Sequence, residues 1–293
     1  MRKVKSLARV AVGAALLGLI ATGCNVEREL VTSREPSEAE AQEEMQEQAA
    51  FYDIEGSPKL DAAAREYQEY VNGQSELLVD RTEEFVAAVK AGDVEEAKEL
   101  YAPSRVPWER IEPIAEKFGT LDPEVDAREG DVPDRQWTGF HRIENTTEGQ
   151  GEYADELTPD VERLERKVDA VRLQASDPVF GAVELLNEVS ATKITGEEER
   201  YSHTDLYDIA ANVEGAEVAF EFVKPVVRRE NPDLVAQIEA CFKDLEGEMA
   251  PYRQGDGWVS YEKVDEGQRR VLSQKIDALA EPLSRVGRVL SGT

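Results

Sequence analysis

Residues 60–89 read LDAAAREYQEYVNGQSELLVDRTEEFVAAV, and this stretch decides the fold class. Its apolar residues recur at intervals of three, four and seven, the spacing that places side chains on one face of an α-helix. They are Leu60, Ala64, Tyr67, Val71, Leu78, Phe85 and Val89. Gly92 ends the pattern, and Asp93 is a residue type that caps a new helix. The stretch therefore predicts one long amphipathic helix followed directly by another.

Helical patterning of the same kind fills the rest of the chain, with proline and glycine at the interruptions. We expect helical segments over residues 93–101, 108–118, 159–173, 178–189, 202–229, 232–245 and 261–290, a turn between Pro103 and Pro107, a loop over 119–136, and a turn at Asp256 and Gly257. Ser202, with Asp205 three residues later, is expected to cap its helix. No strand pattern of any length occurs. The predicted fold is all-α: two antiparallel helical bundles packed together, over about residues 58–135 and 136–293.

The N-terminal segment has the pattern of a bacterial lipoprotein signal. Basic residues lie between Arg2 and Arg9, an apolar run covers residues 10–20, and Ala21-Thr22-Gly23-Cys24 follows. The run is shorter than the roughly 20 residues that span a bilayer. We expect residues 1–23 to be removed and Cys24 to carry a lipid, with an ordinary signal peptide as the alternative. Residues 24–57, rich in Glu, Gln and Ala, predict an acidic flexible tether. The domain is then expected at the extracytoplasmic face of the cell membrane, held by its lipid anchor, or in the periplasm.

Charge and residue usage exclude several functions. The chain has 62 acidic and 34 basic residues, a net charge of −28, which repels phosphate backbones and argues against a nucleic-acid partner. Such a charge is also typical of solubility or salt tolerance, so it supports a metal site only weakly. His141 and His203 are the only histidines, which excludes a His-Glu-x-x-His zinc motif. Besides Cys24 the only cysteine is Cys241, expected in the core on an apolar helix face.

One short motif has metal-ligand spacing. In Gly139-Phe140-His141-Arg142-Ile143-Glu144, a helix would place His141 and Glu144 on one face, where an imidazole and a carboxylate can share an ion. Glu109 and Glu112 repeat the spacing of three, and Asp126 lies between the two motifs. From spacing alone, a solvated acidic face explains these carboxylates equally well.

Several longer segments resemble the imelysin-type domain of the EfeO/EfeM iron-uptake proteins. The resemblance runs from about residue 60 to the C-terminus and rests on residues 101–112, 121–131, 137–144, 193–199, 201–206, 211–216, 256–261 and 279–284. It implies two helical bundles and a metal site at His141 and Glu144, with Glu109, Glu112 and Asp126 as matching carboxylates. The chain is similar to the short, EfeM-like form without a cupredoxin domain. Asn145 and Thr146 stand where the family continues with a Leu-Trp pair, which leaves the end of that helix open.

The resemblance also implies a cargo and partners. One imidazole with several carboxylates suits iron, manganese or zinc, and the concentrated negative charge favours ferric iron, with ferrous iron, zinc and manganese left open. The ion would pass to an EfeU-type iron permease, with an EfeB-type peroxidase as a further partner. Because ligation needs a neutral imidazole, we expect affinity to fall as the pH drops through about 6.5.

Further ligands and other functions stay open at this point. Glu198, one of three consecutive glutamates, is a less certain ligand, together with His203 and Asp205; His203 directly follows the expected cap, which favours a structural role. A metal-dependent peptidase of the imelysin type is the alternative to a non-enzymatic iron carrier, and a polysaccharide-binding lipoprotein is the third reading. Trp108 and Trp137 are expected to flank the site.

Overall fold

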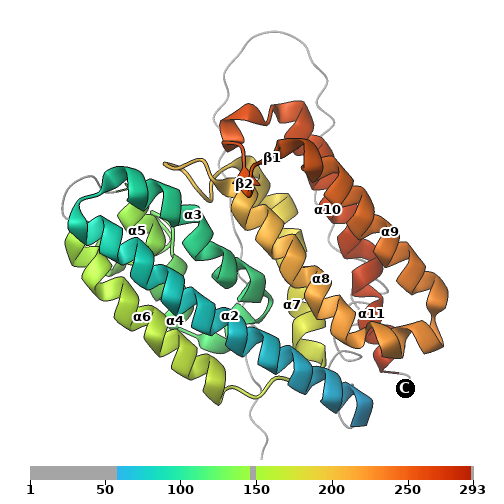
Figure 1. Ribbon diagram of the computed structural model, residues 1–293. Coiled ribbons are helices and arrows are strands. Elements are labelled where there is room, and N and C mark those ends of the chain that lie inside the picture. Colours follow the sequence, from blue (N-terminus) through green and yellow to red (C-terminus); the bar gives the residue numbers. More distant parts are fainter. Residues whose placement is uncertain (1–57, 146–149, 292–293) are drawn as a thin grey trace, which may run out of the picture.

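The computed structural model describes residues 58–145 and 150–291, and these are almost entirely helical (Figure 1). The all-α prediction is confirmed: the strands in the described ranges are two residues long, β1 (Arg253–Gln254) and β2 (Gly257–Trp258), and pair antiparallel around the expected turn. The signal segment, Cys24 and the tether lie outside the described residues. None of the helices described is both long and apolar enough to cross a membrane.

The first group of helices is built on α2 (Pro58–Ala91), whose apolar stripe is buried as predicted. Two long helices pack along it, α3 (Val94–Ile111) and α6 (Gln150–Ala170), with the shorter segments η1 (Glu112–Phe118), α4 (Leu121–Asp126), η2 (Asp134–Gln136) and α5 (Phe140–Asn145) between them. Asp93 caps α3, since its side chain accepts the backbone N–H of Glu96 at 3.2 Å.

The second group surrounds α8 (Asp205–Glu230), which packs against α7 and α9. Its other members are α7 (Ser176–Ala191), η3 (Lys193–Thr195), α9 (Pro232–Met249), η4 (Ala250–Tyr252), η5 (Tyr261–Lys263), α10 (Glu266–Ser284) and α11 (Val286–Leu290). Asp265 and Gln268 form a capping box that starts α10.

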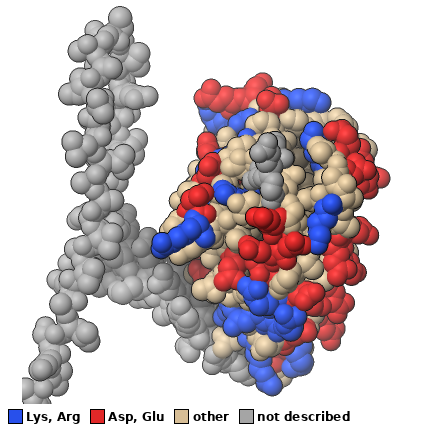
Figure 2. All heavy atoms as spheres, turned by 90° about the vertical axis from the view of Figure 1, so that its left-hand side faces the viewer, with Lys and Arg blue, Asp and Glu red and all other residues tan. Residues whose placement is uncertain are grey.

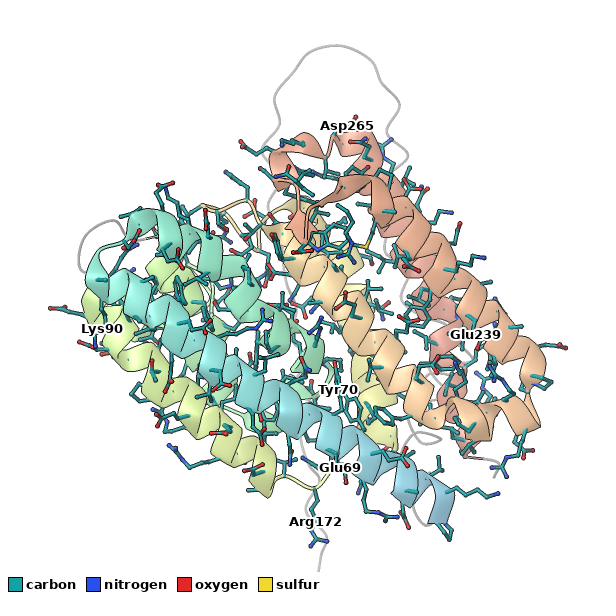
Figure 3. The ribbon with its side chains drawn as sticks, viewed as in Figure 1. Glu69, Tyr70, Lys90, Arg172, Glu239 and Asp265 are labelled. Atoms are coloured by element: carbon teal, nitrogen blue, oxygen red, sulfur yellow. The ribbon has the colours of Figure 1, made fainter. Side chains whose placement is uncertain are left out.

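A close approach of α3 and α8 joins the two groups. A Cβ atom on Gly215 of α8 would lie 2.4 Å from the carbonyl oxygen of Arg110, so only glycine allows these backbones to meet. Nearby, Tyr70 of α2 packs on Phe222 of α8 with ring centroids 6.4 Å apart (Figure 3). Buried side chains of both groups form one continuous hydrophobic core.

Several predicted breaks at proline are wrong, because packing overrides the local preference. Pro103 and Pro107 lie inside α3, and Pro159 lies inside α6. A proline at 107 cannot donate to the carbonyl of residue 103. In the fold, Arg81 of α2 donates to that carbonyl at 3.0 Å, so the lost helical bond is replaced from a neighbouring helix.

Other boundaries also differ from the sequence expectation. Part of the expected loop at 119–136 is helical, as α4, and the last helix breaks at Arg285. Ser202 is not the cap of α8, which begins at Asp205; the Ser202 hydroxyl donates to Glu199 instead. The expected division near residue 135 does not follow the packing, since α5 and α6 pack with the first group, α6 along α2.

The acidic excess is spread over the surface. On the face shown in Figure 2, acidic side chains gather in several groups with basic side chains between them. The net charge of −28 therefore does not by itself point to one location.

Candidate metal centre

The centre lies where α3, α4, α5 and the segment after η3 meet, around a buried histidine. His141 is in the first turn of α5 and is 1 % exposed. Gly139, with φ +84°, precedes it, and a Cβ there would lie 2.2 Å from the carbonyl oxygen of Val125 at the end of α4. The glycine therefore lets α4 and α5 approach closely enough for Asp126 and His141 to face each other.

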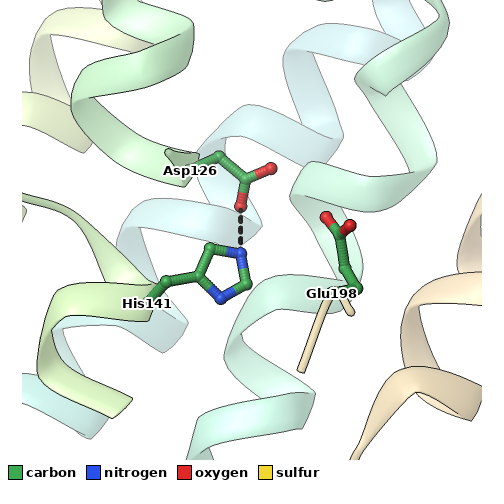
Figure 4. A group of neighbouring side chains, drawn as sticks. All are labelled: Asp126, His141 and Glu198. Atoms are coloured by element: carbon green, nitrogen blue, oxygen red, sulfur yellow. Dashed lines mark ion pairs between the residues drawn. The ribbon is translucent and has the colours of Figure 1, made fainter. Parts of the chain in front are cut away.

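The Nε2 side of the His141 ring faces two carboxylates. Asp126 Oδ1 lies 3.5 Å from Nε2, and one oxygen of Glu198 joins these atoms in a group whose members all lie within 4.8 Å of one another (Figure 4). Nε2 is buried and has no hydrogen-bond partner among the residues described. Its ion-pair partner is Asp126, and Glu198 is the second carboxylate on this side of the ring.

The Nδ1 side of the ring is enclosed by bonded groups. Glu144 Oε2 lies 3.3 Å from Nδ1, and the Tyr101 hydroxyl lies 3.4 Å from it. The other oxygen of Glu144 accepts the backbone N–H groups of Tyr201 and Ser202 at 3.0 and 2.7 Å. His141, Glu144 and the buried Glu199 form a second group with metal-ligand spacing. The two groups share one imidazole, and a neutral ring offers one lone pair.

A fully buried arginine lies among the carboxylates. Arg105 of α3 contacts Glu109 and Asp126 at 2.5 Å and Glu199 at 2.7 Å, with Asp208 at 3.6 Å. Its side chain is 0 % exposed. This guanidinium offsets charges that would otherwise repel one another in a low-dielectric interior.

A buried lysine holds the remaining acids. Lys193 Nζ lies 3.1 Å from Glu109, 2.7 Å from Glu112 and 3.4 Å from Glu198. Asn212 of α8 donates to Glu109 and Glu112 at 3.0 and 2.8 Å. Glu109 and Glu112 therefore bind protein cations, and neither belongs to a metal-spaced group in the described residues.

These contacts raise the pKa of His141 and lower the pKa values of Asp126 and Glu144. Burial and Arg105 lower the pKa of His141, but its interactions with the carboxylates of Asp126 and Glu144 outweigh them and raise it to about 10. Burial raises the pKa of Asp126, but Arg105 and His141 hold it well below its usual range. Burial likewise opposes the charge of Glu144, whose bonds to His141 and Ser202 lower its pKa to about 2. In the metal-free protein these contacts favour a charged His141 beside ionised Asp126 and Glu144.

A cavity of about 810 Å³ lies beside these carboxylates. Asp126, Glu198 and Glu112 line it, whereas Glu144 and Glu199 do not. Other acidic residues in its wall are Glu116, Asp122, Asp131, Asp177, Glu184 and Glu188, against the basic Lys117 and Arg128. Burial, together with the charge of Asp126, raises the pKa of Asp122 to about 7. The acidic lining favours a cation in this cavity, beside Asp126 and Glu198.

Asp205 and His203, the remaining candidate ligands from the sequence, are bonded elsewhere. Asp205 accepts the backbone N–H of Glu199 at 3.2 Å, and His203, with φ +56°, contacts Glu199 and Tyr261 through its backbone. Neither belongs to a metal-spaced group in the described part of the chain.

Trp108 and Trp137 are 0 % and 2 % exposed, so they offer no face to a sugar. Trp108 packs on Phe118, and Trp137 donates to the carbonyl of Ala127. Cys241, expected in the core, is half-buried.

Sequence reasoning missed the cations, and it left the choice among the consecutive Glu197, Glu198 and Glu199 open. Arg105 and Glu109 have the spacing of an ion pair on one helix, a signal that was present. Nothing local marks Lys193 as buried, because its closest partners, Glu112 and Glu109, lie 81 and 84 residues away.

Comparisons with known proteins found a family model and several relatives that match this chain. The family model described as Imelysin matches residues 63–286. The chain is 44 % identical over 241 residues to the "Iron uptake system component EfeO" of Escherichia coli strain K12, and equally to that of Shigella flexneri, covering 79 % of this chain and 64 % of theirs. The match thus spans less than two thirds of the length of these relatives.

Proposed function

The chain belongs to the imelysin family, and on that premise we propose that it is an iron-binding component of an iron-uptake system. It captures the ion outside the cytoplasm and hands it to a membrane permease. The observation that carries the proposal is the buried His141, whose Nε2 faces the carboxylates of Asp126 and Glu198, both of which line an acidic cavity.

We assign the ion to the Nε2 side of His141, with Asp126 and Glu198 as its other ligands. Both carboxylates line the cavity through which a cation would arrive, and Glu112 reaches the same cavity as a further ligand. Three or four oxygens with one imidazole nitrogen form a set that suits iron, manganese or zinc. The density of negative charge favours the ferric ion among these.

Glu144 and Glu109, the other predicted ligands, have different roles in this proposal. A carboxylate that accepts the Nδ1–H of a metal-binding histidine fixes the ring and leaves Nε2 free for the ion. Glu144 has this position, since its other oxygen is bonded to the backbone at Tyr201 and Ser202. Glu109 contacts both Arg105 and Lys193 and, unlike Asp126 and Glu198, does not line the cavity.

The location and partners follow from the sequence and the relatives' name. A lipid on Cys24 would hold the domain at the extracytoplasmic membrane surface, close to an EfeU-type permease. An EfeB-type peroxidase is the other partner proposed. The relatives are iron uptake system components by name, which supports partners within such a system.

Binding is favoured over peptide hydrolysis at this site. A zinc peptidase needs an open metal position and a free general base. Glu112, one of the acids that line the cavity, is bonded to Lys193 and Asn212. Cleavage of a peptide library by the purified protein, dependent on added zinc, would instead support the peptidase.

The test compares the two histidines. The protein is purified without chelator, its metal content is measured, and ferric nitrilotriacetate, ferrous iron, zinc and manganese then compete for it. His141→Ala is expected to lose tight iron binding and keep its circular dichroism spectrum. His203→Ala, the matched control, is expected to bind as the wild type does. Equal iron binding by His141→Ala and the wild type would refute the site.

A further inference from the structure

The ammonium group of Lys193 occupies a cradle of carboxylate oxygens next to the proposed iron ligands. The side chain is 1 % exposed, and Nζ lies 2.9 and 2.7 Å from the two oxygens of Glu112 and 3.1 Å from Glu109. Glu198, also assigned to the iron, lies 3.4 Å away. The lysine therefore stands where several carboxylates converge, as they would on a metal ion.

The oxygens of this cradle are held by other groups as well. Asn212 donates to both Glu109 and Glu112, Arg105 contacts Glu109, and Arg128 contacts Glu198 at 2.8 Å. The carboxylates would thus stay converged if the ammonium were removed. A set made only of oxygens suits hard cations such as Mn²⁺.

We propose that the Lys193 ammonium fills a second cation position in the cluster and so restricts the protein to a single metal ion at His141. Glu198 is shared between the two positions, so the fixed charge of Lys193 lies beside the cargo ion. A second metal ion could share bridging carboxylate ligands with the first and form a two-metal centre. An ammonium group at that position cannot. This inference rests on the proposed function for the first ion.

A purely structural counter-ion would behave differently. If Lys193 only neutralised buried acids, its loss would lower stability and leave the number of bound ions unchanged. If it fills a cation position, its replacement by a neutral side chain of similar length opens that position. The number of bound ions therefore separates the two roles.

The experiment counts manganese. Wild-type protein and variants are dialysed against Mn²⁺, and bound metal is measured by elemental analysis and electron paramagnetic resonance. We expect one ion per chain in the wild type and two in Lys193→Met. Lys193→Arg retains the charge and is expected to bind one. Lys117→Met removes a lysine from the wall of the same cavity, where it pairs with Asp177, and is also expected to bind one.

Two further measurements keep the test decisive. In the His141→Ala background, Lys193→Met is expected to bind one Mn²⁺, whereas His141→Ala alone binds none. If Lys193→Met unfolds without metal, Mn²⁺ is expected to restore its melting temperature. A folded Lys193→Met that gains no ion in either background, or an unfolded one that Mn²⁺ does not rescue, overturns the inference. Iron binding retained by His141→Ala would instead overturn the proposed function alone.

Discussion

The carboxylate of Glu144 ties the ring of His141 to the backbone of a distant segment. One oxygen lies 3.3 Å from Nδ1, and the other accepts the N–H groups of Tyr201 and Ser202. The ring orientation is therefore set from two sides of the fold. With Nδ1 held by a carboxylate, the opposite nitrogen faces Asp126, which lines the cavity.

The first prediction concerns Glu144 itself. Glu144→Gln is expected to keep one bound ion per chain with an affinity about 10–100-fold lower, the usual cost of losing a carboxylate behind a metal-binding histidine. Titration calorimetry with the variant measures both quantities. Complete loss of binding, as expected for His141→Ala, would mean that Glu144 is a direct ligand.

The second prediction concerns pH and corrects the value expected from the sequence. With its pKa raised to about 10, His141 is charged at neutral pH in the metal-free protein and must release a proton to bind metal. Affinity is therefore expected to rise with pH well above 6.5, up to about 10. Zinc titrations at pH 7.5 in two buffers of different ionisation enthalpy should give about one proton released per ion. An identical heat in both buffers would contradict this.

The same shift affects the stability of the metal-free protein. The folded-state pKa of His141 lies above its unfolded value of about 6.5, so the charged ring stabilises the fold fully below that pH. This contribution is lost as the pH rises through about 10. Urea unfolding of His141→Asn should lack this decline.

The third prediction concerns Arg105, which is buried against three carboxylates. Arg105→Met leaves them uncompensated and is expected to cost about 3–5 kcal/mol in the free energy of unfolding, measured with urea. Lys98→Met, which removes an exposed pair with Glu95, should leave the midpoint unchanged. Equal midpoints for both variants would show that the buried charges are compensated in another way.

The fourth prediction tests the approach of α4 to α5. Gly139→Ala adds a Cβ 2.2 Å from the Val125 carbonyl in addition to its strained φ of +84°, so Asp126 and His141 should separate. We expect a loss of about 1–3 kcal/mol in stability and weaker metal binding. Gly92→Ala has a similar φ of +70° and open space, so it should lower stability alone. Unchanged iron affinity in Gly139→Ala would contradict the assignment of Asp126.

The fifth prediction concerns the lipid anchor. Cys24→Ser removes the thiol that would carry the lipid, so the protein should move from the membrane fraction to the soluble fraction of lysed cells. Fractionation and immunoblotting measure this, with Cys241→Ser as the matched control that should remain with the membrane. Soluble protein in the wild type would favour the ordinary signal peptide.

The sequence alone determined the helical class, because apolar spacing along α2 and the cap at Asp93 are local properties. It also paired His141 with Glu144, since residues three apart on a helix are neighbours. The helix break predicted between Pro103 and Pro107 is wrong. The carbonyl of Pro103 lacks its helical donor, and Arg81 of another helix supplies the hydrogen bond instead.

Tertiary structure alone decided which acids face the cavity. Glu197, Glu198 and Glu199 are consecutive and chemically identical, yet Glu197 pairs with Arg200 near the surface, Glu198 faces His141, and Glu199 contacts Arg105. Arg105 and Lys193 likewise come from distant segments, yet each contacts one of the two carboxylates that face His141 as well as Glu109. Such choices depend on which long side chains from distant segments meet, and a pattern of neighbouring residues does not contain that information.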